Sequence, residues 1–320
     1  MRILFITSTR VGDAILSTGL LSKLIADNPE AKIPIGCGPA AAPLFEAVPN
    51  LERIIVLDKM IFSLHWIAMW WAAVGKFWDV LVDLRNSPMS VPLAAAKRFR
   101  FVRKREPEHR VLQLAAVMGL SEELPTPSIW FSPQARATAK ALIPNGGPVL
   151  AVGPTANWQA KIWRAEYFVD LIERLSGPGG ILPGARVAVF GRDDERPMAL
   201  RVIDAVPEDR RIDLVGRIGL LEAGACLERA QFYVGNDSGL MHLAAAAGVP
   251  TLGLFGPSLE ELYAPWGPLC AIARADKSFN EIFPPNFDHR ATGTLMDSLT
   301  VDTVEKAARD LWRRVAEAAA

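Results

Sequence analysis

The 320-residue sequence has only three cysteines and four histidines, which limits the kinds of site it can build. Cys37, Cys226 and Cys270 are far apart, odd in number and not part of any Cys-x-x-Cys pair. This pattern argues against a disulfide framework and against a structural zinc site. It fits a reducing, cytoplasmic compartment. The histidines are scattered, so we expect no metal site.

The sequence also lacks an excess of charge and a long apolar run. Lys plus Arg and Asp plus Glu are equal at 35 each, so a general nucleic-acid-binding protein is not expected. No run reaches the roughly 20 apolar residues of a membrane-spanning helix, and the N-terminus does not resemble a signal peptide. The charge is unevenly spread: residues 1–145 carry 17 basic and 12 acidic side chains, and residues 146–320 carry 18 and 23. A basic half and an acidic half predict two domains with different partners.

Short apolar runs alternate with helical patterns along the chain, which predicts an α/β protein with parallel sheets covered on both faces. In the first half, strands are predicted at residues 3–7, 32–35, 53–57, 79–84 and 99–102. In the second half, they are predicted at residues 149–152, 187–190, 212–215, 232–234 and 251–255. Helices are predicted at residues 13–26, 165–175 and 303–319. The pattern is typical of two doubly wound, Rossmann-like domains, which bind ligands at the carboxyl ends of their strands.

Five prolines and a Gly-Gly pair between residues 120 and 148 indicate a linker. We place the boundary late in this stretch, giving an N-terminal domain at 1–145 and a C-terminal domain at 146–300. A final helix at 301–320 follows the second domain and can pack back on the first. A cleft between the two facing domains is the expected place for chemistry.

The most informative segment, residues 235–246, follows a predicted strand and reads GNDSGLMHLAAA. Ser238 can cap the helix that begins there, and the free N–H groups of a helix end attract an anion. His242 lies one turn into that helix. A capped, buried helix with a packed histidine is the alternative interpretation.

Two further turns follow strands of the same predicted sheet. Gly256, Pro257 and Ser258 are by themselves only a turn, but beside the first segment they form a second rim of one pocket. The loop after residue 152 contains Thr155 and Lys161, and a hydroxyl, loop amides and a lysine can hold phosphates. The loop lacks the Walker signature, and an ordinary surface loop remains the alternative.

Asp13 follows the first predicted strand, and Gly12 before it permits a tight turn. One interpretation is that Asp13 caps the helix. The other is that Asp13 is a general base at the carboxyl edge of the N-terminal sheet.

These motifs together resemble glycosyltransferase family 9, the bacterial lipopolysaccharide heptosyltransferases. The resemblance covers most of the chain and includes Gly12-Asp13, residues 79–84, Lys161-x-Trp163, residues 235–244 and residues 254–258. It implies a GT-B fold of two facing Rossmann-like domains, with the nucleotide sugar in the C-terminal domain and the acceptor in the N-terminal one. It also implies ADP-heptose as donor, inversion, and no metal ion or other cofactor.

The resemblance and the residue chemistry assign the same roles. Asp13 is expected to be the general base, and Lys161 is expected to stabilise the leaving diphosphate. The residues expected to bind the donor are Thr155, Lys161, Asp237, Ser238, Gly239, Leu240, Met241, His242, Gly256, Pro257 and Ser258.

Two segments indicate an anionic, lipid-linked acceptor at the cytoplasmic face of the inner membrane. Residues 97–110 contain seven basic side chains, which fit anionic lipid or an acidic oligosaccharide, or else form a solvated charged face. Residues 60–75 are uncharged and rich in tryptophan, which fits a membrane interface, a buried helix or a dimer contact. The expected acceptor-binding residues are Arg10, Gly12, Arg98, Arg100, Arg103, Lys104 and Arg105.

Two other functions on the same fold are considered. A nucleotide-sugar 2-epimerase would leave the basic and tryptophan-rich segments unexplained. A non-catalytic nucleotide-sugar-binding protein would not need Asp13. A dinucleotide oxidoreductase is disfavoured, because no G-x-G-x-x-G follows either opening strand.

Overall fold

The computed structural model describes residues 1–58, 65–102, 107–120, 124–283 and 293–319. The chain divides into two compact units, Met1–Ser132 and Pro133–Ala320. The division falls before the boundary expected after residue 145. The helix α4 (Pro133–Leu142) explains this correction, because it buries Ala135 and Ala139 and packs against α7 (Leu220–Leu227) of the second unit.

The first unit contains a parallel sheet of five described strands in the order β3-β2-β1-β4-β5. The strands are β1 (Ile3–Ile6), β2 (Ile33–Cys37), β3 (Leu51–Val56), β4 (Trp78–Asp83) and β5 (Ala95–Arg100). The chain builds outward from β1 to β3 and then returns to the other side of β1 with β4. The reversal makes a topological switch point between β1 and β4, where the loops that follow these strands diverge.

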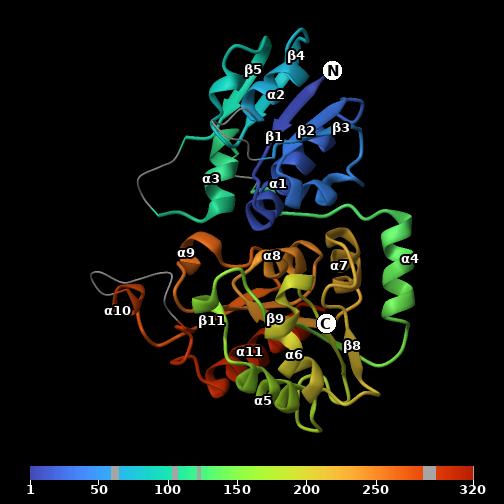
Figure 1. Ribbon diagram of the computed structural model, residues 1–320, viewed down its shortest axis with the longest axis vertical. Helices are drawn as coiled ribbons and strands as arrows, with labels where there is room; N and C mark the ends of the chain where they lie inside the picture. Colours follow the sequence, from blue (N-terminus) through green and yellow to red (C-terminus); the bar gives the residue numbers. More distant parts are fainter. Residues whose placement is uncertain (59–64, 103–106, 121–123, 284–292, 320) are drawn as a thin grey trace. The chain divides into compact units, whose positions relative to one another are not determined.

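Helices cover both faces of this sheet (Figure 1). Leu4 and Ile6 on one face of β1 pack with Met69 and Ala73 of α2 (His65–Ala73). Helices α1 and α3 lie on the other side of the sheet and pack against each other. The remaining elements of this unit are α1 (Val11–Asp27), α3 (Arg110–Val117) and two short 3₁₀ helices, η1 (Pro39–Phe45) and η3 (Pro88–Ser90).

The second unit contains a parallel sheet of six described strands in the order β11-β10-β9-β6-β7-β8. The strands are β6 (Val149–Gly153), β7 (Arg186–Val189), β8 (Arg211–Asp213), β9 (Phe232–Asn236), β10 (Thr251–Phe255) and β11 (Cys270–Arg274). The sequence did not predict β11, because two of its five residues are alanines, which are weak strand formers. The switch point of this sheet lies between β6 and β9.

The helices of the second unit also form two layers. One layer holds α5, α6 and α11, and the other holds α4, α7 and α8 (Figure 1). The remaining elements of the unit are α5 (Ala165–Ser176), α6 (Arg196–Ala205), α8 (Gly239–Ala246), α9 (Glu260–Tyr263), α10 (Phe279–Ile282), α11 (Val301–Ala319), η4 (Gln159–Lys161) and η5 (Asp193–Glu195).

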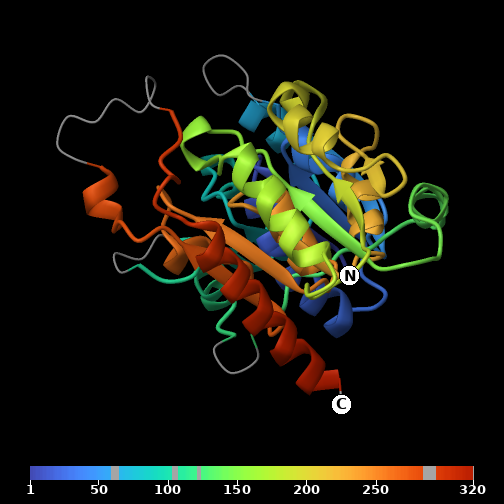
Figure 2. The ribbon, with the colours of Figure 1, turned by 90° about the horizontal axis from the view of Figure 1, so that it is seen from below.

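The last helix, α11, lies along the sheet of the second unit beside α5 (Figure 2). Its apolar face, predicted from the helical spacing, joins that unit's core through Val304, Ala308 and Leu311, which are completely buried. The helix is therefore part of the second unit. This corrects the alternative in which it packs back on the N-terminal domain.

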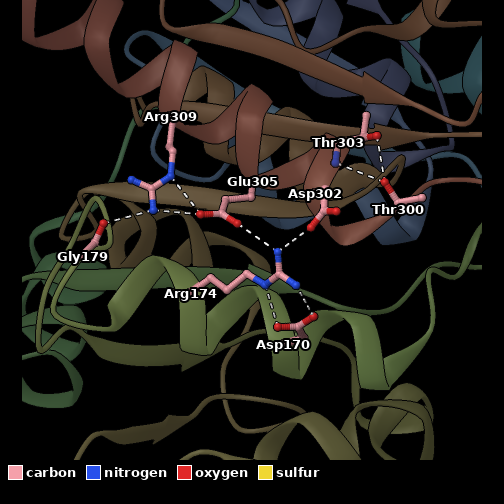
Figure 3. A network of polar contacts seen from close by, with 8 residues as sticks. All are labelled: Asp170, Arg174, Gly179, Thr300, Asp302, Thr303, Glu305 and Arg309. Atoms are coloured by element: carbon pink, nitrogen blue, oxygen red, sulfur yellow. Dashed lines mark hydrogen bonds and ion pairs between the residues drawn. The ribbon is translucent and has the colours of Figure 1, made fainter.

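Ion pairs fasten α11 to α5 (Figure 3). The Arg174 guanidinium contacts Asp170 at 2.7 Å on its own helix, and Asp302 at 2.6 Å and Glu305 at 3.1 Å on α11. Glu305 also accepts a hydrogen bond from Arg309 Nε at 2.9 Å. The hydrogen bond from Arg309, and a second one from Arg174, hold the pKa of Glu305 below its usual range against the opposing effect of burial.

We predict that Glu305→Gln lowers the free energy of unfolding by about 1 kcal/mol at neutral pH, the upper end for partly exposed ion pairs. The pKa of Glu305 is lower in the folded state than its unfolded-state value near 4.5. The stability that Glu305 contributes is therefore fully present above the unfolded-state pKa, and it is lost as the pH falls through the folded-state pKa. Urea unfolding from pH 7 to pH 3 measures the difference between wild type and variant. Asp310→Asn, which removes only a contact with Arg313, serves as the control. A difference that does not shrink towards pH 3 would contradict this account.

Candidate active site

The switch point of the second unit brings together two polar residues that are 76 positions apart. Lys161 ends the loop after β6, and Asp237 directly follows β9. The Lys161 Nζ donates to Asp237 Oδ2 at 2.5 Å. The Asp237 side chain is only 7% exposed and that of Lys161 is 22% exposed, so the pair sits at the edge of the protein surface. The predicted phosphate-binding loop and the predicted helix end therefore meet at one place.

The loop that carries Lys161 is held by the protein interior. The Trp163 backbone N–H donates to Asn236 Oδ1 at 3.1 Å, which ties the loop to the end of β9. The Trp163 indole N–H donates to the Leu299 carbonyl at 2.8 Å, and Leu295 N–H donates to the Ala160 carbonyl at 3.0 Å. These bonds fix the base of the lysine side chain before any ligand arrives.

Thr155, also in the loop after β6, contacts an acidic residue that sequence reasoning missed. Its Oγ1 donates to Glu195 Oε2 at 2.8 Å, and the same oxygen accepts from Arg192 N at 3.0 Å. Glu195 is 7% exposed and ends η5, the short helix after β7. The signal was present: Rossmann units place an acidic residue after the second strand, where it binds a ribose hydroxyl.

Two glycines make room for a tyrosine: Gly153 is the last residue of β6, and Gly235 is the second-last residue of β9. A Cβ atom on Gly153 would lie 2.1 Å from the Tyr233 hydroxyl oxygen, and one on Gly235 would lie 2.3 Å from it. Tyr233 is completely buried, and burial raises the pKa of its phenol, while the side chain of Ser238 opposes this rise. These two glycines thus admit a buried side chain that reaches Ser238.

Helix α8 begins at the predicted place. Ser238 occupies the N-cap position but makes no capping hydrogen bond with its side chain. Gly239 and Leu240 are partly exposed at the first turn, whose N–H groups lack partners within the helix and suit an anion. Met241 is completely buried and His242 is 5% exposed. The Met241 sulfur packs against Gly253, since a Cβ atom on that glycine would lie 2.4 Å from it. Met241 therefore belongs to the core.

The turn of Gly256, Pro257 and Ser258 follows β10, which pairs with β9, so it lies at the same edge of the sheet as Asp237. Gly256 and Pro257 are buried, and a Cβ on Gly256 would lie 2.5 Å from the sulfur of Met296. The Ser258 Oγ is buried and has no hydrogen-bond partner among the described residues. This hydroxyl is available to a ligand at that edge.

The switch point of the first unit contains a pocket of about 270 Å³, and Asp13 lines it. Asp13 is the third residue of α1, and the N-cap is Arg10, so Asp13 does not hold the capping position. Its Oδ1 lies 3.8 Å from Arg110 Nε, too far for a hydrogen bond. That oxygen is buried and has no hydrogen-bond partner within the described part of the chain. The capping interpretation of Asp13 is therefore wrong.

Two described basic residues of the stretch at 97–110, Arg98 and Arg100, brace a neighbouring loop. Arg98 donates to the backbone carbonyls of Ser90 and Leu93. Arg100 donates to the carbonyl of Ser87 at 3.1 Å. The guanidinium groups of these two expected acceptor ligands are thus already engaged with backbone carbonyls between residues 87 and 93.

The other expected acceptor residues are spread out. Arg10 is exposed at the start of α1, and Gly12 lies in the first turn of that helix, next to Asp13. Arg103, Lys104 and Arg105 lie outside the described residues.

The tryptophan-rich segment forms a two-sided helix where it is described. In α2, Met69 and Ala73 are completely buried, whereas Trp71 is 70% exposed and Ile67 is 46% exposed. One side of α2 is therefore core, and the other presents large apolar side chains to the surface. No helix among the described residues is both long and apolar enough to span a bilayer.

Two Rossmann-like units, each with polar groups at its switch point, define a two-domain α/β protein of the GT-B type. The comparisons with known proteins agree. Residues 86–281 match the family model described as glycosyltransferase family 9 (heptosyltransferase). The chain belongs to this family and is a glycosyltransferase. The predicted family and fold class are confirmed.

Individual relatives are distant but nearly full length. The chain is 25% identical to lipooligosaccharide heptosyltransferase 2 of Haemophilus influenzae, over 86% of this chain and 88% of the relative. Its structure is similar to that of a family 9 glycosyl transferase from Veillonella parvula, with a TM-score of 0.79 at 20% identity, covering 98% and 97% of the two chains. It is also similar to the E. coli ADP-heptose heptosyltransferase II, with a TM-score of 0.74 at 20% identity, covering 98% and 99%.

The Lys161–Asp237 pair makes a prediction about the ligand-free protein. Lys161→Met should lower the free energy of unfolding by roughly 1–3 kcal/mol, because it leaves the Asp237 carboxylate buried without its cation. Adding Asp237→Asn should restore most of the loss, because both charges are then removed. Urea unfolding of the two single variants and the double variant measures the coupling. A double variant whose loss equals the sum of the two single losses would show that the pair contributes nothing.

Proposed function

We propose that this chain transfers heptose from ADP-heptose to the lipopolysaccharide core, with inversion and without a metal ion. The observation that carries the proposal is the Lys161–Asp237 pair beside the start of α8 at the β6/β9 switch point. Doubly wound sheets bind nucleotides at this position. The names of the relatives support the sugar and the acceptor, since they are lipopolysaccharide or lipooligosaccharide heptosyltransferases.

The donor nucleotide fits the second unit part by part. The diphosphate binds Lys161 and the N–H groups at the start of α8, which supply positive charge where the leaving group develops negative charge. The ribose hydroxyls bind Glu195, in the position where Rossmann units hold a ribose. Asp237 then shares Lys161 with the diphosphate and accepts hydrogen bonds from donor hydroxyls.

The transfer is a single displacement. The acceptor hydroxyl oxygen attacks the anomeric carbon of the donor, and the bond from that carbon to the diphosphate oxygen breaks. The proton of the hydroxyl passes to Asp13, whose Oδ1 has no hydrogen-bond partner among the described residues. Attack opposite the leaving group inverts the anomeric configuration. Lys161 and the helix end take the place that a metal ion has in other glycosyltransferases.

The first unit also suits a lipid-linked acceptor at the cytoplasmic face of the inner membrane. Ile67 and Trp71 are one helical turn apart and both exposed, so they can enter the headgroup region together. The basic side chains at 97–110 add attraction to anionic lipid. The epimerase and non-catalytic alternatives give no role to an acceptor pocket around Asp13, and the family assignment favours transfer over both.

For catalysis, we predict that Asp13→Asn lowers the transfer rate by 10²-fold or more, the usual contribution of a general base. Stability and ADP affinity should persist, because Asp13 caps no helix and lies in the other unit from the donor site. Transfer of heptose to purified lipopolysaccharide core, with calorimetry of ADP binding, measures both. Asp27→Asn at the other end of α1 is the matched control.

The same assay tests the remaining parts of the proposal. Wild-type activity should survive EDTA, and the product should have the inverted anomeric configuration by NMR. Loss of activity in EDTA that Mg²⁺ restores would overturn the metal-free mechanism. Near-wild-type transfer by Asp13→Asn at saturating substrate would place the base elsewhere.

For membrane association, we predict that Ile67→Ser with Trp71→Ser weakens binding to vesicles of phosphatidylglycerol and phosphatidylethanolamine by roughly tenfold or more. Burial of a large apolar side chain in the membrane contributes about 1.5–3 kcal/mol to binding, so the loss of two such side chains should be measurable. Vesicle flotation gives the bound fraction. Leu200→Ser, at an exposed apolar side chain of α6, is the control and should bind like wild type. Equal binding by all three proteins would exclude α2 as the contact.

A further inference from the structure

Two buried hydroxyl groups lie beneath the first turn of α8. One is the phenol of Tyr233, a completely buried residue of β9, and the other is the Oγ of Ser238, the N-cap residue of α8. Neither oxygen has a hydrogen-bond partner within the described part of the chain. A buried hydroxyl without a partner loses its bonds to water and gains none in return, so such groups are uncommon in folded proteins. Two of them at one place need a physical reason.

The position of the Tyr233 hydroxyl is fixed by its neighbours. Gly153 and Gly235 pair in register near the carboxyl ends of β6 and β9, and a Cβ atom on either glycine would collide with this hydroxyl. A Cβ atom on Gly153 would also lie 3.1 Å from Cδ2 of Leu240, in the first turn of α8. The phenol therefore runs along the face of the sheet on which α8 packs, and its oxygen lies between the glycine pair and the start of that helix.

Ser238 has the backbone of an N-cap residue but does not use its side chain as a cap. Its backbone is extended, with φ of −150° and ψ of 171°, yet its side chain makes no capping hydrogen bond. A serine at this position usually accepts a bond from an N–H group of the first turn, and that bond stabilises the helix. Here the side chain lies near the phenol instead, since burial raises the pKa of Tyr233 and the Ser238 side chain lowers it.

The two hydroxyls can form a chain that a third group completes. A serine hydroxyl can accept one hydrogen bond while it donates another. If the phenol donates to Ser238 Oγ, the proton of Ser238 is left to donate to an acceptor on the other side. No acceptor for it is found among the residues that the structure describes. An anion at the start of α8 would supply one, because the N–H groups of a helix end attract it to that place.

We propose that Tyr233 is a positioning residue of the donor site, which donates to Ser238 Oγ while Ser238 donates to an oxygen of the donor's diphosphate. This chain of two hydrogen bonds is the hydroxyl relay. The inference rests on the proposed function, which puts the diphosphate at the start of α8, and it adds a residue that acts on the nucleotide only through another. One phosphate oxygen then satisfies both buried hydroxyls. Hydrogen bonds in a chain polarise one another, which strengthens the bond to phosphate.

The hydroxyl relay separates the effect of Tyr233 on stability from its effect on binding. Tyr233→Phe keeps the ring and removes an oxygen that has no partner within the described chain. Without nucleotide, the variant should therefore unfold at the wild-type temperature or above it. Its affinity for ADP should nevertheless fall roughly 3- to 10-fold, the effect of one hydrogen bond between neutral groups.

Calorimetric titration of ADP into wild type, Tyr233→Phe, Ser238→Ala and the double variant measures the coupling of the two hydroxyls. Ser238→Ala should weaken ADP binding, and adding Tyr233→Phe should cause no further loss, because the phenol acts only through Ser238. Adenosine, which has no phosphate, should bind wild type and Tyr233→Phe equally. Tyr167→Phe, which removes a phenol hydroxyl from α5, is the matched control and should bind ADP like wild type.

A spectroscopic measurement on the wild type needs no variant at residue 233. The chain has three tyrosines, so labelling with ¹³C at Cζ gives three resonances, and substitution of Tyr167 and Tyr263 by phenylalanine assigns them. The Tyr233 resonance should shift when ADP is added and should stay in place with adenosine. The reason is that the phenol gains its bond when a phosphate oxygen orients Ser238.

The proposal is overturned if Tyr233→Phe keeps the wild-type affinity for ADP, if it weakens ADP binding equally in the Ser238→Ala background, or if ADP leaves the Tyr233 resonance in place. A lower unfolding temperature for Tyr233→Phe, with adenosine weakened as much as ADP, would show a structural role and would also overturn it. If wild type binds UDP or GDP in place of ADP, the proposed donor fails, and the same comparison with that nucleotide decides the role of Tyr233. If wild type binds none of the three, the hydroxyl relay is overturned together with the donor site.

Discussion

The pairing of β6 with β9 decides which residues of the second unit can share a site. The paired residues Gly153 and Gly235 are 82 positions apart in the sequence, yet the two strands lie side by side because the chain reverses direction across the sheet. The two glycines leave space for the hydroxyl end of the buried Tyr233 side chain, which lies over one face of the sheet. Any larger residue at either position would clash with the Tyr233 hydroxyl and displace that side chain. The proposed donor site therefore depends on close packing beneath it as well as on its own charges.

In the first unit, strand pairing at the switch point also decides which residues come together, but their chemistry differs. Its switch point, between β1 and β4, carries Asp13 and Arg85 instead of a lysine and a helix end suited to phosphate. In the proposed function, one sheet edge stabilises a leaving diphosphate, and the other holds an acceptor and takes a proton. This division agrees with the basic first half and acidic second half of the sequence only in part, because Arg98 and Arg100 stabilise a loop rather than a ligand.

The sequence predicted most strands and the segments that carry Asp13, Lys161 and Asp237, because apolar runs and turn residues mark where strands end. The fifth strand was predicted at 99–102, whereas β5 spans Ala95–Arg100. The charged residues Lys97 and Arg98 interrupt the apolar pattern of this edge strand, so the pattern did not reveal where it begins. Glu195 and Tyr233 were missed. Glu195 could have been found from its place after the second strand of the unit, but its contact with Thr155, 40 positions away, could not.

The central claim is that the nucleotide binds at the β6/β9 switch point, and a crystal structure of this chain with ADP tests it most directly. The account predicts density for the diphosphate beside Lys161 and the first turn of α8, and the ribose within hydrogen-bond distance of Glu195. The Lys161–Asp237 contact should lengthen or become shared with a phosphate oxygen. Density for ADP in the pocket around Asp13, or at a site without Lys161, would contradict the account.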